Sequence, residues 1–364
     1  MVILNNKENF YIDIKNRAME IYEQYQYLVK EALKDENDTS KYNLKFCLKE
    51  DSNLGGKAWS SNYLDNIQVN KGVIDNFFEY FYGFTKMKTD DFMKKLRIDE
   101  DEETSYEFIK FDSNGNANLF DSKVIDYKLA GLLTIFVSRF IITHELGHLL
   151  NGHCEYINSK EQNSENSVQY ISMFEEDNSK NIKNVSSLDF RTLEMDADAF
   201  AATDNFRNLI LLYEKFEEMV DQDLNIKPIE LFYWWSFAIR SNFIITQRIL
   251  SDEEYRLDKK HLPSVARWIL ILGSVVNIID EGIYKINYRA GDNKEKLLKS
   301  LTTGFLFAEN CYNERFYTNY NCLEETINSA DYGHYATATQ RNWENLRSEL
   351  KKFSRLLLYK SNNV

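Results

Sequence analysis

Proline and cysteine are both scarce in this chain, and each shortage narrows the class of protein. Pro228 and Pro263 are the only prolines in 364 residues. Because proline interrupts helices, its scarcity is typical of a mostly helical chain with few rigid loops. The four cysteines lack the spacing of a disulfide framework, which indicates free thiols in a reducing cytosol; they are Cys47, Cys154, Cys311 and Cys322.

Positive charge and long apolar runs are also limited. The 44 basic residues are outnumbered by 57 acidic ones, which gives a net charge of −13. Without a local basic surface, this balance argues against binding to nucleic acid or anionic membranes. The N-terminus does not read as a signal peptide, and the runs 129–137, 231–239 and 268–279 are shorter than the roughly 18 residues that span a bilayer. We therefore expect a soluble cytoplasmic protein that binds no nucleic acid and inserts in no membrane.

Histidine is rare as well, yet two of the five histidines fall in one pentapeptide, His144-Glu-Leu-Gly-His148. On a helix, residues at i and i+4 share a face, so both imidazoles can reach one metal ion, and Glu145 can reach a water bound to it. The run from Leu129 to Leu150 is apolar on nearly every side, which predicts a buried helix. A glutamate and two histidines inside such a helix are costly unless paired or metal-bound. This context favours a zinc site over two ordinary helical histidines.

A second motif, Glu194-Met-Asp-Ala-Asp198, can complete that site. Catalytic zinc takes three protein ligands and keeps one open position, and Glu194 is the predicted third ligand. Asp198, one turn later, is predicted to accept a hydrogen bond from the outer nitrogen of a liganding histidine, His144 in preference. Asp196 lies off this face and is expected on the solvent side or in a salt link. The alternative is an ordinary acidic helix start.

Two neighbouring residues are weaker candidates for the metal. On a continuous helix, His153 would point away from His144 and could reach the metal only if the chain breaks at Gly152. We expect Gly152 to end the helix and His153 to lie at the rim of the site. Cys154 could bind zinc as a thiolate, but nothing in the sequence pairs with it.

Together these motifs resemble the gluzincin-type zinc metallopeptidases. Glu-x-x-Ala-Asp followed by Ala-Phe-Ala-Ala resembles the ImmA/IrrE-type peptidases and the HtpX/CAAX-protease group. The stretch from His144 to His153 is similar to the ImmA/IrrE pattern and to the phage-exclusion peptidase Lit. The resemblance covers about residues 55–200, and the gap between the motifs is longer here than in compact members. It implies a zincin-like core, Zn²⁺ as cofactor and a protein or peptide substrate.

The HtpX/CAAX group also carries a His-Pro element with an arginine six residues after the histidine. His261 and Arg267 match this spacing, although a leucine separates His261 from Pro263. By resemblance, His261 would donate a hydrogen bond to the oxyanion of the reaction, and Arg267 would hold that region in place. The alternative is that His261 only enters a helix whose first position is Pro263. Weaker oxyanion candidates are Tyr332, His334 and Tyr335.

The predicted fold is mainly α (α+β), with a small sheet over the His-Glu-x-x-His helix and a helical C-terminal region. We expect a metallopeptidase core at 1–204, with an inserted mobile loop at 157–187, and a helical region at 205–364 packed on the core. Strands are expected within 43–70, with 57–70 as an edge that pairs with extended substrate. Helices are expected at 7–34, 72–86, 123–151, from about 189, and at 205–222, 228–250, 262–281, 293–311 and 322–358.

The sequence thus predicts a soluble zinc-dependent endopeptidase that cleaves a specific intracellular protein. Phage defence or stress response is implied by resemblance alone. One alternative is a catalytically weak zincin-fold regulator or sensor that acts by protein binding; the intact Glu145 counts against it. Another is a structural zinc protein, for which four protein ligands are expected. An activating partner or ligand, and the oligomeric state, stay open.

Overall fold

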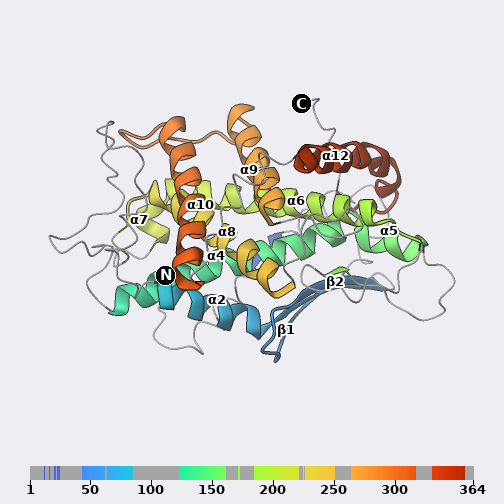
Figure 1. Ribbon diagram of the computed structural model, residues 1–364, viewed down its shortest axis with the longest axis horizontal. Coiled ribbons are helices and arrows are strands. Elements are labelled where there is room, and N and C mark those ends of the chain that lie inside the picture. The colour runs from blue at the N-terminus through green and yellow to red at the C-terminus, as the bar shows by residue number, and fades with distance from the viewer. Residues whose placement is uncertain are drawn as a thin grey trace.

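The computed structural model is mainly helical with one small sheet, which confirms the predicted fold class (Figure 1). Its long helices α4 (Lys123–Leu150) and α6 (Ser187–Glu214) lie side by side along the longest axis of the molecule. Apart from isolated positions between 12 and 24 and at 224, the structure describes residues 43–61, 64–84, 123–160, 171–172, 184–220, 226–250, 264–316 and 330–356.

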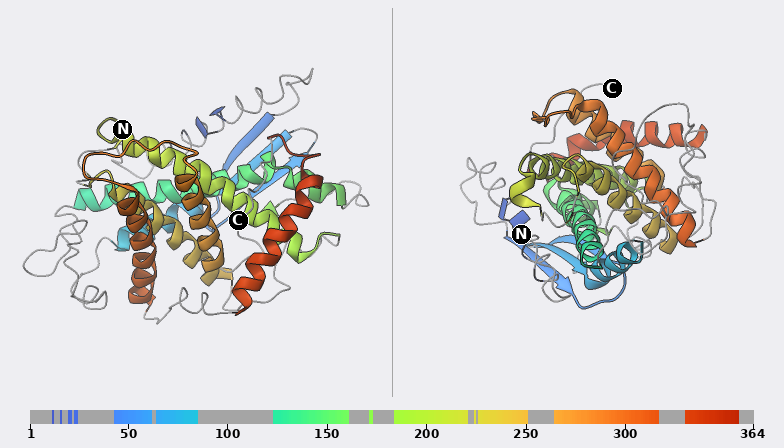
Figure 2. Two further views of the ribbon diagram at one scale, coloured as in Figure 1. Left: turned by 90° about the horizontal axis from the view of Figure 1, so that it is seen from above. Right: turned by 90° about the vertical axis from the view of Figure 1, so that its left-hand side faces the viewer.

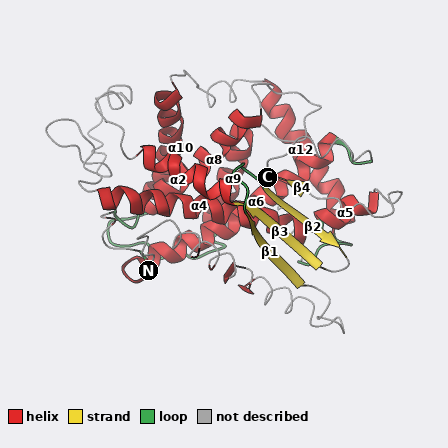
Figure 3. Cartoon of the chain, turned by 90° about the horizontal axis from the view of Figure 1, so that it is seen from below, coloured by secondary structure: helices red, strands yellow, loops and turns green. Residues whose placement is uncertain are grey.

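The sheet lies against one side of the helical body (Figure 3). Its strands are β1 (Asn43–Lys49), β2 (Gly56–Ser61), β3 (Leu64–Asn70) and β4 (Ile171–Ser172), in the order β1-β3-β2-β4. β3 runs parallel to β1 and antiparallel to β2, so that Ile67 has Phe46 on one side and Ala58 on the other.

This topology corrects the prediction of an edge at 57–70. β3 is paired on both sides, so it cannot add a substrate strand. β2 is paired with β4 at Lys57 and Ala58. Strands β2 and β3 pack on α4, and the buried side chains of Ala58 and Ile67 join the main hydrophobic core. The sheet therefore covers the helix that carries the two histidines, as predicted.

The helix α4 (Lys123–Leu150) is the centre of the core. Its segment Lys128–Leu150 is long and apolar enough to cross a membrane, but 89% of the apolar window is buried inside the protein. Two of the polar residues that interrupt its apolar runs have partners: the Thr134 hydroxyl donates to the Ala130 carbonyl at 2.7 Å, and Arg139 pairs with Asp204 at 2.7 Å. A buried core helix explains the composition. The helix α2 (Lys71–Phe84) follows β3 directly and packs on α4.

The helix α6 (Ser187–Glu214) carries the second motif and packs along α4. Its start is fixed by a capping box, in which the Ser186 side chain accepts from the Asp189 N–H and the Asp189 carboxylate accepts from the Ser186 N–H. The helix runs without interruption through residues 204 and 205. The boundary predicted there falls inside a continuous helix that serves both the core and the C-terminal region.

The C-terminal region is helical (Figure 2): α8 packs on α4, α9 and α12 pack on α6, and α10 packs on α8. Its aromatic centre is α8, where Trp234, Trp235 and Phe237 are almost fully buried. This segment packs as core, as its composition predicts. The elements are α7 (Phe216–Met219), α8 (Glu230–Leu250), α9 (Ser264–Asp280), α10 (Lys294–Phe316) and α12 (Ala330–Leu350).

The predicted inserted loop at 157–187 is only partly a loop. The helix α5 (His153–Lys160) extends into it, and the short strand β4 lies within it. Residues 161–170 and 173–183 lie outside the described part of the chain, and so does most of the helix predicted at 7–34.

Candidate metal centre

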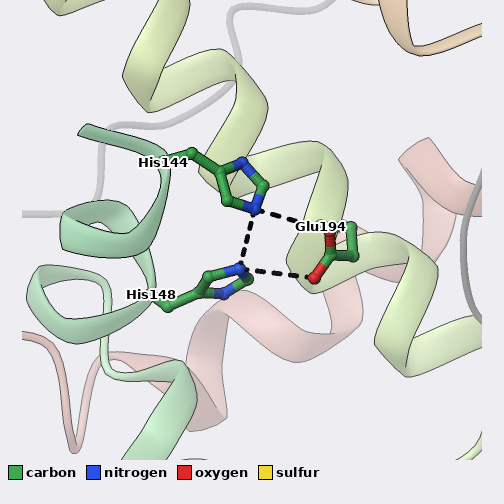
Figure 4. A group of neighbouring side chains, drawn as sticks. All are labelled: His144, His148 and Glu194. Carbon is green, nitrogen blue, oxygen red and sulfur yellow. Dashed lines mark hydrogen bonds and ion pairs between the residues drawn. The ribbon is translucent and has the colours of Figure 1, made fainter. Parts of the chain in front are cut away.

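His144, His148 and Glu194 converge on one point between α4 and α6 (Figure 4). Nε2 of His144 lies 3.0 Å from Nε2 of His148. The Glu194 carboxylate faces both rings, with Oε1 3.3 Å from Nε2 of His148 and Oε2 3.5 Å from Nε2 of His144. All three side chains are buried. The three predicted ligands therefore come together, from two helices that lie about 50 residues apart in the sequence.

The mutual distances of these donor atoms fit a zinc ion. Zinc binds histidine nitrogen and carboxylate oxygen at about 2.0–2.2 Å, and tetrahedral ligands at that radius lie roughly 3.3 Å from one another. The observed separations of 3.0, 3.3 and 3.5 Å bracket that value. In the described part of the chain no fourth acidic residue, histidine or cysteine joins the group. Two imidazoles and one carboxylate form the ligand set of a catalytic zinc site with one open position.

Charge balance gives a second reason to place a cation here. Glu145, Glu194 and Asp198 are buried carboxylates, and Arg267 is the buried cation beside two of them. With all three carboxylates ionised, two negative charges would be left over, and a buried excess of charge is strongly unfavourable. One divalent cation neutralises it. The same negative charge affects His144. Burial alone would lower the pKa of this side chain, but its hydrogen bonds to Asp198 and Glu194 raise the pKa to about 9. A divalent ion would replace that proton.

The outer nitrogen of His144 is held by Asp198, as predicted. Nδ1 of His144 lies 2.9 Å from Oδ1 of Asp198, which leaves Nε2 free to face the metal position. Arg267 fixes the carboxylate by two hydrogen bonds of 2.7 Å, from Nε to Oδ2 and from Nη2 to Oδ1. Burial opposes ionisation of Asp198, but the charge and hydrogen bonds of Arg267 outweigh it and lower the carboxyl pKa. Asp198 is therefore a fixed anion.

Arg267 thus acts on the metal site through Asp198. The resemblance implied a role near the oxyanion, whereas the structure places the guanidinium 4.7 Å from the centre of the Phe243 ring and against the Asp198 carboxylate. Its partner in the predicted element, His261, lies outside the described residues. The side chains of Tyr332 and Tyr335 also lie outside them, and His334 is exposed on α12.

The outer nitrogen of His148 faces His153, which does not lie where it was predicted. His153 is fully buried, and its Nδ1 lies 2.9 Å from Nδ1 of His148. On its other side, Nε2 of His153 lies 3.0 Å from Oδ2 of Asp196, which also accepts from Asn151 at 2.6 Å. His153 is therefore not a rim residue, whereas Asp196 is in a salt link, one of the two positions predicted for it, with its side chain 14% exposed. The helix ends at Gly152, and this break allows the His153 ring to reach His148.

Gly152 does end α4, as predicted, with a left-handed φ of 80°. The chain turns there and starts α5 at His153, so the ring returns toward His148. Nearer the three candidate ligands, Gly147 lets α4 and α6 approach each other, since a Cβ at this position would lie 3.2 Å from Cα of Ala197. Cys154 is buried, with its Sγ 3.7 Å from the Ala58 carbonyl and its thiol pKa raised by burial, and it is not among the donors.

A contact that sequence reasoning missed joins the C-terminal segment to this turn. Nη1 of Arg355 donates to the Leu149 carbonyl at 2.7 Å, and Nη2 donates to Asp65 of β3 at 2.7 Å. The Arg355 N–H donates to the Leu150 carbonyl at 2.8 Å. These bonds satisfy carbonyls at the end of α4, which lack helical partners. No local pattern connects Arg355 with residues about 200 positions earlier, so the sequence carried no signal for it.

Glu145 lies between the two histidines on α4 and is fully buried. Its charge, with those of Asp198 and Glu194, raises the pKa of Arg267 against the effect of burial.

No family model, curated protein or solved structure matches this chain. The assignment of the site therefore depends on its own geometry and on the motif resemblance.

Proposed function

We propose that this protein is a zinc-dependent endopeptidase. One observation carries the proposal: three donors of the catalytic zinc set lie 3.0–3.5 Å apart in a buried site, with Asp198 on the outer nitrogen of His144. A structural zinc site would supply a fourth protein ligand. None is present in the described part of the chain.

His144, His148 and Glu194 would hold the metal, which when bound lowers the pKa of a coordinated water and polarises the scissile carbonyl. Glu145 accepts the proton of the attacking water and passes it to the leaving nitrogen. Asp198, fixed by Arg267, keeps His144 in the tautomer that presents Nε2. His261 stays a proposal for the oxyanion donor, since it lies outside the described residues.

The substrate we propose is one specific intracellular protein, cleaved in the cytoplasm. Support for this narrower statement comes from the motif resemblance and from the acidic, cysteine-poor composition. Phage defence or stress response rests on the resemblance alone.

Comparison of wild type with Glu145→Gln tests the proposal. Glutamine keeps the size of the side chain and removes the base, so the variant should retain its metal and lose roughly 10²–10⁴-fold or more in cleavage rate. Each protein would be expressed in the same cells, and new protein N-termini would be identified by mass spectrometry. The matched control Glu281→Gln changes an exposed glutamate at the end of α9 and should behave as wild type.

New N-termini that appear with wild type and with Glu281→Gln, and not with Glu145→Gln, support an endopeptidase. The same N-termini from a metal-loaded Glu145→Gln protein would overturn it. A metal-loaded wild type that produces none, but captures a partner equally well with either residue at 145, would favour the regulatory sensor instead.

A further inference from the structure

The two liganding histidines are supported in different ways. Nδ1 of His144 faces a carboxylate, Asp198, which is fixed by an arginine. Nδ1 of His148 faces a second imidazole, that of His153, at 2.9 Å, and the far nitrogen of this ring lies 3.0 Å from Asp196. His148, His153 and Asp196 form a chain of side chains, which we call the 148–153–196 relay. It runs from the buried metal site to a carboxylate that is 14% exposed.

With a metal on Nε2 of His148, these contacts determine which atom carries each proton. If Nε2 of His148 binds the metal, its Nδ1 must carry the hydrogen, because a neutral imidazole has one protonated nitrogen. Nδ1 of His153 must then accept, and its Nε2 carries the second hydrogen. That N–H donates to Oδ2 of Asp196. Each donor in the relay therefore has an acceptor, and only one pair of tautomers satisfies both contacts.

The fold holds each end of the relay in place. Asn151 donates to the same Oδ2 of Asp196 at 2.6 Å, so the carboxylate is fixed from two sides. His153 is the first residue of α5, directly after the turn at Gly152. Helix α6 thus supplies both a ligand, Glu194, and the carboxylate that ends the relay. The two motifs are connected by this second path as well as by the metal.

We infer that His153 is a positioning residue of the metal centre: it accepts a hydrogen bond from His148, is itself oriented by Asp196, and so sets the tautomer and basicity of that ligand. The inference rests on the proposed metal centre and adds a residue to it. Outer partners of this kind change metal affinity by roughly 10–100-fold when removed.

Zinc affinity measured by competition with a chromophoric chelator tests it without a cleavage assay. Asn and Leu have similar shapes, and the Asn side-chain oxygen falls where Nδ1 of histidine lies. His153→Leu should weaken zinc binding roughly 10–100-fold, and His153→Asn should recover most of that loss because it keeps the acceptor. Asp196→Leu should weaken binding by less, since His153 stays in place. Cys154→Ala, a truncation of the next buried residue, is the control and should bind as wild type.

Imidazole N–H resonances of the zinc-loaded protein give a second reading. With only five histidines, a sample labelled in histidine nitrogen has few signals. We expect slowly exchanging protons at Nδ1 of His144, Nδ1 of His148 and Nε2 of His153. His153→Leu should remove the last resonance, shift that of His148 because its Nδ1–H loses its acceptor, and leave that of His144 unchanged, a pattern that a general loss of packing would not produce.

The outcomes separate the relay from the metal centre itself. If His144→Ala/His148→Ala loses zinc while His153→Leu and His153→Asn both bind it as wild type, the relay is wrong and the metal centre stands. Equal losses in the Leu and Asn variants, with no selective change of the His148 resonance, would also overturn the relay. If the double variant binds zinc as wild type, the proposed metal centre fails.

Discussion

Substitution of Gly152 by alanine should damage the turn that joins α4 to α5. Gly152 has a φ of 80°, and a non-glycine residue in this left-handed region costs about 1–2 kcal/mol. A Cβ at this position would lie 2.6 Å from the carbonyl carbon of Phe353 and 2.6 Å from the nitrogen of Ser354. These are backbone atoms, so the C-terminal segment must move, and overpacking of this kind costs about 1–3 kcal/mol. We expect Gly152→Ala to lose about 2–5 kcal/mol in the free energy of unfolding.

Two other glycines separate the sources of this loss. Gly291 has a φ of 86°, and a Cβ at this position would have nothing within 4 Å, so Gly291→Ala should lose only the conformational part, about 1–2 kcal/mol. Gly273 lies inside α9 with open space around it, so Gly273→Ala should raise the free energy of unfolding by about 0.5–1 kcal/mol, because glycine destabilises a helix interior relative to alanine. Denaturant unfolding with and without zinc measures all three. A Gly152→Ala protein no less stable than Gly291→Ala would refute the packing of the C-terminal segment on this turn.

Two further predictions concern buried charge. Burial raises the pKa of Glu230 from 4.5 to about 7, against the hydrogen bond from the Lys227 N–H. Because the folded-state pKa is raised, the stabilising contribution of Glu230 is present below pH 4.5 and is lost as the pH rises through 7. The free energy of unfolding of Glu230→Gln relative to wild type should therefore increase by about 3 kcal/mol across this window. A difference between the two proteins that does not change with pH would contradict this prediction. Arg267→Met leaves the Asp198 carboxylate buried without its cation and should lower the free energy of unfolding by about 3–5 kcal/mol. As the control, Lys294→Met removes an ion pair with Asp280 whose side chains are about half exposed, and it should cost about 1 kcal/mol or less. Similar losses in the two variants would contradict the assignment of Arg267.

The three ligands and the contact between His144 and Asp198 could be predicted from the sequence because they depend on local spacing. His144 and His148 are one helical turn apart, and so are Glu194 and Asp198, so each pair shares a face once its helix forms. The helices themselves were predictable from their composition, and the start predicted near residue 189 lies close to Ser187, where α6 begins. The His144–Asp198 contact follows from these two patterns.

The relay could not be read in this way because it depends on the direction of the chain after a break. A helix wheel placed His153 away from the metal and Asp196 on the outer side of α6. The left-handed turn at Gly152 reverses the first placement, and His153 then reaches Asp196. The position of that turn in space is set by Arg355 and the Phe353 backbone, contacts that no local pattern encodes. The edge at 57–70 failed for a similar reason, since strand order is a tertiary property.

The most direct test of the metal centre is the zinc content of the purified protein, measured by elemental analysis for wild type and for the His144→Ala/His148→Ala variant. The geometry of His144, His148 and Glu194 predicts about one zinc ion per chain in wild type and almost none in the double variant. Full zinc occupancy in the double variant would contradict the assignment of these ligands, and so would a correctly folded wild type that binds no zinc when it is supplied.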